Sequence, residues 1–236
     1  MKSLARIALI ILALNTAAFA GNDFKLYLKS GTVETVSNMN ELQMVGLGDP
    51  FELVNGNYYR IIQFNALPTN VEKEALANEG IQLLNYLPKN AYYAQINSAA
   101  SIQVLKNFNV RAVLKVTSQF KLSEKLLANK YEDWAVIGTS LKVNGVYFKG
   151  ISKQEIQSSI EAIGGSVILI NDVNIARVQV PFGRLNDLYA LNGFYYFEQV
   201  DAPGEPENLV GVTDHRSNNL LTSYNTGLKY DGTGVT

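Results

Sequence analysis

The sequence predicts an α+β protein in which one order of strands and helices, βαββαβ, occurs twice in tandem. Segments rich in β-branched and aromatic residues alternate with segments whose apolar residues recur at helical spacing. Two helix starts of the form Ser/Thr-x-x-Glu, at Thr69 and Ser152, lie 83 residues apart. Asn90 and Asn174, each in a turn between two predicted strands, lie 84 residues apart. These three observations indicate a repeated unit.

Residues 1–20 have the features of a secretory signal peptide. Lys2 and Arg6 are basic, residues 7–14 are apolar, and Ala18–Ala20 (Ala-Phe-Ala) fits the small-x-small cleavage rule. The apolar run is shorter than the roughly 20 residues that span a membrane. We therefore expect a secreted protein with no membrane span after the signal is removed. The alternative, an N-terminal core helix, would need a polar face that this segment lacks.

Residues 21–57 are predicted to form an N-terminal hairpin and cap. Phe24–Leu28 and Thr32–Val36 are strand-like and flank a Ser-Gly turn. Residues 46–50 separate this hairpin from the repeats.

The first βαββαβ unit is predicted over residues 58–120. Its first helix begins at the Thr69 capping box and ends at Gly80, the residue type that best adopts a left-handed conformation. The predicted strands are 58–65, 81–86, 91–96 and 110–117, and the second helix is 98–108.

A linker hairpin and the second unit are predicted over residues 121–200. A short helix over 122–130 precedes a hairpin over 134–148 that turns at Asn144-Gly145. The unit then has a strand that ends over 146–149, helices from Ser152 and over 185–191, and further strands over 167–170, 175–180 and 194–200. This order is that of the split-βαβ, ferredoxin-like fold. The alternative is an unrelated α+β domain with chance internal similarity.

The composition limits the functions open to the chain. It has 20 basic and 21 acidic side chains and no basic run, so we expect no nucleic-acid partner. The absence of cysteine excludes thiol catalysis, thiolate metal sites and disulfides. His215 is the only histidine, which excludes zinc sites that need two imidazoles. The sequence therefore predicts neither a cofactor nor a metal.

No catalytic residue is predicted. Gly138–Ser140 (Gly-Thr-Ser) would need a base, and the only imidazole, His215, lies in a segment of different character. Asp214–Ser217 holds the three residue types of a catalytic triad, but neighbours in an extended chain point in different directions, so we expect local turn bonding. Asp231–Gly234 lacks the further carboxylates of a calcium loop and the lysine of a phosphate loop.

The aromatic run Phe194, Tyr195, Tyr196 and Phe197 is predicted to be a strand with partners on both faces. In a regular strand Phe194 and Tyr196 face one way, and Tyr195 and Phe197 face the other. A βαββαβ unit carries helices on one sheet face only, so its other face is polar unless something covers it. These residues are therefore predicted either to pack between the two units or to dock on another domain.

After Val200 the chain loses its periodicity and ends in Gly227–Thr236 (Gly-Leu-Lys-Tyr-Asp-Gly-Thr-Gly-Val-Thr). An exported chain with βαββαβ units, an acidic tail and this stretch resembles the N-terminal propeptide and the start of the catalytic domain of a secreted subtilisin-like serine protease. In that family a similar stretch leads into the strand that carries the catalytic aspartate. The family's His-Gly-Thr-His and Gly-Thr-Ser-Met-Ala motifs are absent, since Leu141 and Lys142 follow Gly138–Ser140.

The resemblance implies a subtilase-propeptide-like fold and role. Residues 201–214 would be an extended processing linker, and residues 215–236 would be the start of a truncated catalytic domain. The pro-region would act as an intramolecular chaperone and temporary inhibitor of its own catalytic domain. Its open sheet face would pack on the protease and its tail would lie in the active-site cleft. The parent polypeptide would be a serine endopeptidase, and this segment would be inactive alone.

The tail leaves directly from the last predicted strand, which favours the second unit for docking. Pro203 and Pro206 favour an extended chain, and cleavage is predicted near Asn208, Leu209 and Val210, an apolar stretch suited to substrate pockets.

Two other functions stay open. The chain could be a free-standing secreted protein-binding or protease-inhibitor module, or a structural surface protein with no enzyme attached. The sequence stops in a Gly-rich run that leads into a predicted strand, which is typical of a truncated reading frame and favours the pro-region.

Overall fold

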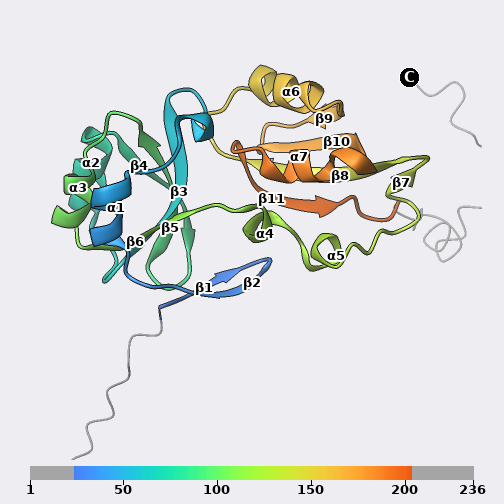
Figure 1. The fold of residues 1–236 in the computed structure, drawn as a ribbon. Helices are drawn as coiled ribbons and strands as arrows, with labels where there is room; N and C mark the ends of the chain where they lie inside the picture. Colours follow the sequence, from blue (N-terminus) through green and yellow to red (C-terminus); the bar gives the residue numbers. More distant parts are fainter. Residues whose placement is uncertain (1–23, 204–236) are drawn as a thin grey trace, which may run out of the picture.

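The protein has an α+β fold in which two antiparallel sheets lie side by side and a hairpin runs beneath both (Figure 1). A computed structural model describes residues 24–203. Within this described range, no helix has both the length and the apolar character needed to cross a membrane. The predicted signal peptide (1–20), the predicted linker beyond residue 203 and the predicted start of a catalytic domain (215–236) lie outside it.

The first sheet has the strand order β4-β5-β3-β6, with all neighbouring strands antiparallel. Helices α2 and α3 cover one of its faces, where Leu76 and Leu105 pack against Tyr58 and Ile62. The elements are β3 (Asn57–Phe64), α2 (Asn70–Asn78), β4 (Ile81–Leu87), β5 (Ala91–Asn97), α3 (Ile102–Asn107) and β6 (Val110–Lys115).

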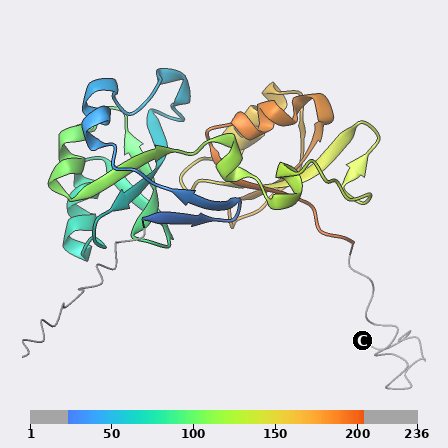
Figure 2. The same cartoon turned by 60° about the horizontal axis from the view of Figure 1, so that its bottom comes forward.

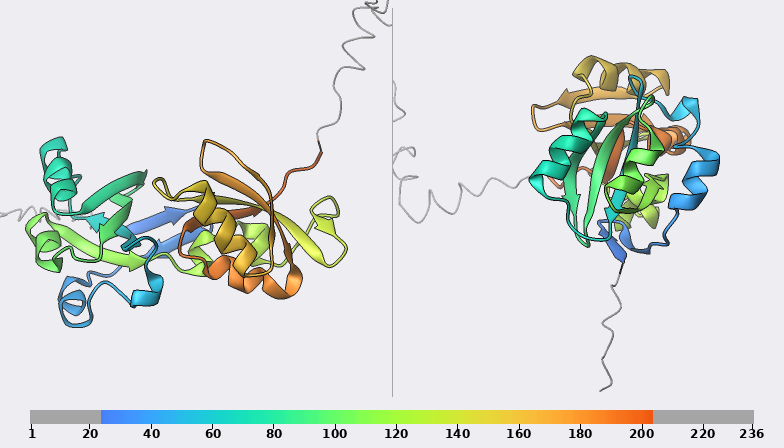
Figure 3. Two further views of the ribbon diagram at one scale, coloured as in Figure 1. Left: turned by 90° about the horizontal axis from the view of Figure 1, so that it is seen from above. Right: turned by 90° about the vertical axis from the view of Figure 1, so that its left-hand side faces the viewer.

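The second sheet has the order β11-β8-β10-β9, again antiparallel, with the short strand β7 also paired to β8. Helices α6 and α7 lie on one of its faces (Figure 3). The elements are β7 (Val136–Ile137), β8 (Ser140–Tyr147), α6 (Lys153–Ala162), β9 (Ser166–Ile170), β10 (Ile175–Pro181), η2 (Phe182–Arg184), α7 (Leu185–Ala190) and β11 (Phe194–Gln199).

The predicted N-terminal hairpin is present as β1 (Lys25–Leu28) and β2 (Gly31–Glu34). Figure 2 shows it lying across both sheets, and the side chain of Leu26 is fully buried in the core between them. Helix α1 (Met39–Val45) and the 3-10 turn η1 (Pro50–Glu52) follow. The sequence does not predict α1, which is short and is held by packing of Met39 and Leu42 on the first sheet.

Two short helices, α4 (Ser118–Lys121) and α5 (Glu124–Leu127), link the sheets and lie against β11. The sequence predicts one helix over 122–130 at this place. The chain makes two because Leu122 takes an extended conformation and forms a bridge with Phe197, so the helical hydrogen bonds are interrupted there.

Both predicted capping boxes are confirmed. The hydroxyl of Thr69 accepts a hydrogen bond from the Glu72 N–H, and that of Ser152 accepts one from the Glu155 N–H, each at 3.3 Å. Both glutamate side chains accept a bond back from the backbone N–H of the capping residue. These contacts span three residues, so the local sequence is sufficient to specify them.

The helix predicted over 98–108 is too long at its start. Helix α3 begins only after Ser101, whose hydroxyl accepts a bond from the Gln103 N–H. The side-chain oxygen of Asn97 accepts a bond from the Ala99 N–H and holds the preceding residues in a turn. An asparagine side chain of this kind competes with helix formation.

The hairpin turn predicted at Asn144-Gly145 is wrong. The chain turns at Gly138-Thr139, between β7 and β8, and Asn144-Gly145 lies inside β8, a strand paired on both edges. A Cβ on Gly145 would lie 2.8 Å from ring carbons of both Phe194 and Phe197. The glycine is therefore needed for close approach of two rings and not for a turn.

The two sheets share one core through a cluster of aromatic rings. Tyr59 of β3 stacks on Phe148 with 4.4 Å between ring centroids. Tyr93 of β5 lies 4.9 Å from Tyr195 of β11 and 5.6 Å from Phe148. Burial raises the pKa of Tyr59 to about 12 and also raises that of Tyr93. The face of the first sheet opposite its helices is thus covered by the second sheet and the hairpin.

Candidate docking surface

The second sheet has one face that its own helices do not cover. Val143 and Val178 point toward α6 and α7 and are fully buried. The residues that alternate with Val143 along β8 and with Val178 along β10 point to the opposite face of the sheet. This face is called here the free face. Its outward residues are Lys142, Asn144 and Val146 on β8, Arg177 and Gln179 on β10, Tyr196 and Glu198 on β11, and Leu169 on β9.

One row of the free face crosses all four strands. Glu198, Asn144, Arg177 and Leu169 are successive cross-strand partners. The Arg177 Nε donates a hydrogen bond to Asn144 Oδ1 at 3.0 Å. Leu169 is 55% exposed, and Arg177 is exposed as well. The row therefore presents a charged and an apolar side chain together, a mixture typical of protein interfaces.

The aromatic strand β11 does not alternate as predicted. Its register against β8 shifts between Phe194 and Tyr196, so that Tyr195 forms a bulge. Phe194 and Phe197 consequently both point into the core, with ring centroids 5.0 Å apart. Tyr196 points to the free face, and Tyr195 packs between the two sheets. Of the four residues proposed for docking, Tyr196 alone lies on the free face.

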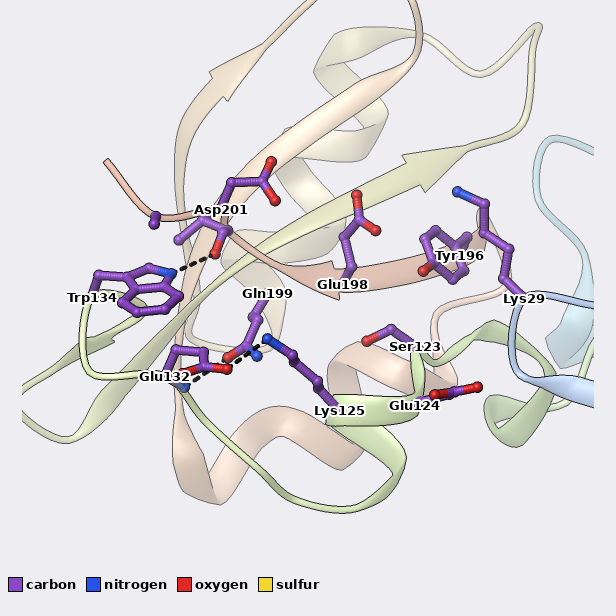
Figure 4. Close-up of a pocket in the computed structure, with 12 residues that line it drawn as sticks. Lys29, Ser123, Glu124, Lys125, Glu132, Trp134, Tyr196, Glu198, Gln199 and Asp201 are labelled. Carbon is purple, nitrogen blue, oxygen red and sulfur yellow. Dashed lines mark hydrogen bonds and ion pairs between the residues drawn. The ribbon is translucent and has the colours of Figure 1, made fainter. Parts of the chain in front are cut away.

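A hollow of about 390 Å³ lies at the edge of the free face, where the described chain ends (Figure 4). The Trp134 indole N–H donates to the Val200 carbonyl at 3.1 Å, and the Glu132 backbone N–H donates to the Gln199 side chain at 2.9 Å. These bonds hold the end of β11 against the segment before β7. Val200, Asp201 and Ala202 line the hollow, so the described chain ends beside the free face.

Carboxylates outnumber ammonium groups around this hollow. Glu124, Glu132, Glu198 and Asp201 line it together with Lys29 and Lys125. Lys125 pairs with Glu132 at 2.5 Å, and the Lys29 ammonium lies 4.4 Å from the centre of the Tyr196 ring. Burial and the neighbouring Glu198 raise the pKa of Tyr196, so its hydroxyl stays protonated at neutral pH. The hollow is therefore an acidic, partly aromatic surface. Among the described residues no group of three or more acidic or histidine side chains is arranged to hold a metal ion.

The remaining sequence-predicted residues fall in different places. Ser140 is the first residue of β8 and is paired with Ile137 and Pro181. The predicted processing residues Asn208, Leu209 and Val210 lie outside the described residues, as does the only histidine, His215.

One buried lysine is not predicted by the sequence. Lys121 is 1% exposed, and its ammonium donates to the Tyr189 carbonyl at 3.2 Å and to the Leu191 carbonyl at 2.7 Å. It thereby satisfies carbonyls at the end of α7, a favourable place for a cation. Burial, together with Lys115, lowers the pKa of Lys121 to about 8. Nothing in the short segment 118–121 distinguishes this lysine from a solvated one.

The comparisons with known proteins give one match. Residues 27–117 match a family described as a domain of unknown function (DUF8729). The matched region starts inside β1 and includes the first sheet, but it stops before α4 and the second sheet. No curated protein and no solved structure matches the chain.

Proposed function

We propose that the chain is the pro-region of a secreted subtilisin-like serine endopeptidase, acting as an intramolecular chaperone and a temporary inhibitor. The observation that carries this proposal is that the described chain ends just after β11, beside the free face of the second sheet. A partner joined to that end meets the free face at a high effective concentration, so a modest interface is sufficient for inhibition.

In this proposal the two sheets belong to two ferredoxin-like copies, over residues 58–120 and 121–200. Both sheets place the four strands of a βαββαβ order in the same sequence, since β4-β5-β3-β6 and β9-β10-β8-β11 correspond strand by strand. Asn90 and Asn174 both have positive φ (57° and 60°) just before β5 and β10. Gly80 and Gly164, also 84 residues apart, both have φ near 80° after the first helix. These shared backbone positions support an internal duplication.

The burial of the two central strands supports the second copy as the one that docks. Every residue of β3 after Asn57 is buried, because the helices cover one face and the second sheet and hairpin cover the other. Strand β10 instead alternates, with Ala176, Val178 and Val180 buried and Arg177 exposed. Asn144 and Tyr196 are only 8% and 9% exposed, so a partner reaches the free face at Arg177 and Leu169, without separating the two sheets.

The tail would complete the inhibition. An extended segment that follows β11 can bind in a protease cleft through its backbone as an added strand. Cleavage would fall near Asn208, Leu209 and Val210. N-terminal sequencing of the secreted mature enzyme tests this point, and a mature chain that begins before Pro203 would contradict it.

The first experiment is to read the coding DNA past Thr236. The proposal predicts an apolar strand ending in Asp-x-Gly, with His-Gly-Thr-His and Gly-Thr-Ser motifs further on. A stop codon at or just after Thr236 would remove the enzyme and favour a free-standing binding or inhibitor module.

The second experiment measures inhibition of the mature protease by the secreted chain from Gly21, added in trans. Leu169→Arg places a charge on the free face and should weaken inhibition by about tenfold or more, because a buried interface position tolerates charge poorly. Val71→Arg is the matched control, since Val71 is an apolar residue that is 76% exposed and belongs to α2, a helix that packs on the first sheet. Equal inhibition by Leu169→Arg and wild type would reject the free face as the docking surface.

A further inference from the structure

A second hollow, with five tyrosines among its eleven lining residues, lies between the hairpin and the two sheets. Its volume is about 280 Å³, and its walls include Tyr27 of the hairpin, Tyr86 of β4, and Tyr195 and Tyr196 of β11. Tyr93 closes it from the first sheet. Three separate parts of the chain therefore build this hollow, which is called here the tyrosine socket.

The tyrosine socket is continuous with the free face. Val146 and Tyr196, cross-strand partners on the free face, both line it. Lys29 and Tyr196 line it and also line the acidic hollow where the described chain ends. A partner that covers the acidic hollow and the free face therefore borders the socket at Lys29 and Tyr196.

The hairpin is fixed in place before any partner binds. Leu26 is fully buried between the sheets, and the Ser30 hydroxyl donates to the Phe120 carbonyl at 3.1 Å. The Thr35 hydroxyl donates to the Gln63 side chain at 2.5 Å. A wall held by these contacts does not have to be ordered on binding, which lowers the entropic cost of association.

The size and lining of the socket indicate what it takes. Its volume of about 280 Å³ is enough for one side chain of a protein partner and lies at the lower limit of the roughly 300–1,000 Å³ of small-molecule sites. Tyrosine is enriched among the residues that dominate binding energy at protein interfaces, and such anchors fill pockets of this kind. Tyr27 and Tyr86 are 44% and 52% exposed, so their rings are accessible to a partner.

We propose that the tyrosine socket receives an apolar or aromatic side chain of the catalytic domain that follows this chain. The inference rests on the proposed function and adds a second contact to it. The hairpin and the first sheet then hold the catalytic domain beside the second sheet, and this arrangement is called here the clamp. The family match over residues 27–117 includes both the hairpin and the first sheet in one region. Docking requires both copies, although only the second copy offers a free sheet face.

Inhibition of the mature protease by the chain from Gly21 tests the clamp. Tyr86→Ala and Tyr27→Ala should each weaken inhibition by about thirtyfold or more, the loss that defines an interface hot spot. Tyr86→Phe keeps the ring and should inhibit as the wild type does. Phe51→Ala is the control, because Phe51 is an aromatic residue that is 93% exposed and lines neither hollow. Circular dichroism of each variant checks that the fold is kept.

The outcomes separate the two proposals. If the wild-type chain inhibits and both tyrosine variants inhibit within about twofold of it, the clamp is rejected and the proposed function stands. If the wild-type chain does not inhibit, the proposed function falls and the clamp falls with it. A dimer of this chain that Tyr86→Ala abolishes would assign the socket to a second copy and would also overturn the clamp.

Discussion

Replacing Gly145 by alanine is the sharpest test of how the second sheet packs. Gly145 lies in the middle of β8, opposite Phe197 of β11. Its φ is outside the left-handed region, so alanine can adopt the same backbone conformation. Any loss of stability is then caused by contact of the new methyl group with the rings of Phe194 and Phe197, and not by backbone strain.

The magnitude follows from the distances. The new Cβ would lie 2.8 Å from a ring carbon of Phe194 and 2.8 Å from one of Phe197. Carbon atoms pack best at about 3.5–4.0 Å, so each ring must move by roughly 1 Å. Both rings are buried and stacked on one another, which leaves them little room. Overpacking lowers the free energy of unfolding by about 1–3 kcal/mol. Alanine also has less conformational entropy than glycine in the unfolded chain, which raises the free energy of unfolding by about 0.4–1 kcal/mol. We expect a net destabilisation of about 1–2 kcal/mol.

Urea unfolding followed by the fluorescence of Trp134, the only tryptophan, measures this loss. Gly183→Ala is the control, because a Cβ there meets nothing within 4 Å and the backbone φ is not positive. Phe194→Leu should partly rescue Gly145→Ala, with a coupling energy of about 1 kcal/mol in the double-mutant cycle. A Gly145→Ala variant as stable as the wild type, or a cycle with no coupling, would refute the packing argument.

Three further predictions use the same urea assay. The free energy of unfolding should rise from about pH 8 toward 10, because the lowered pKa of Lys121 makes the native state bind fewer protons than the unfolded state. Lys121→Met should lose this rise, and a variant with the pH profile of the wild type would show that Lys121 does not cause it. Ser152→Ala should cost about 1 kcal/mol through loss of the helix cap, whereas an unaltered midpoint would show that α6 does not depend on it. Phe148→Ala should cost about 3–5 kcal/mol because its ring stacks on Tyr59 in the core; a cost under 1 kcal/mol would mean that this contact contributes little.

The sequence predicts well what contacts within a few residues decide. The helix starts at Thr69 and Ser152 are confirmed because the capping side chain and its partner are three residues apart. The end of α2 is predicted for a similar reason, since Gly80 alone supplies the left-handed residue that stops it. Outside the hairpin predicted over 134–148, strand positions follow the runs of β-branched and aromatic residues to within one or two residues.

The predictions that failed depend on residues distant in the chain. Asn144-Gly145 has the sequence of a tight turn, but β10 and β11 pair on both sides of it and the strand continues. The alternation of Phe194–Phe197 is broken by a bulge that places two rings over one glycine of a neighbouring strand. Lys121 is buried only because α7 ends above it.

The candidate docking surface also has features that the local sequence determines and features that depend on distant residues. The sequence by itself determines the order of strands and helices, the helix caps and the aromatic character of β11, because each depends on local periodicity or local hydrogen bonds. Only the tertiary structure decides which side chains remain free. Phe148, Tyr195 and the hairpin cover the face of the first sheet that its helices leave open. On the second sheet, Arg177 and Leu169 remain exposed. Burial of a sheet face is set by the elements that pack on it, and the aromatic rings that cover the first sheet, Phe148 and Tyr195, come from parts of the chain more than 50 residues away.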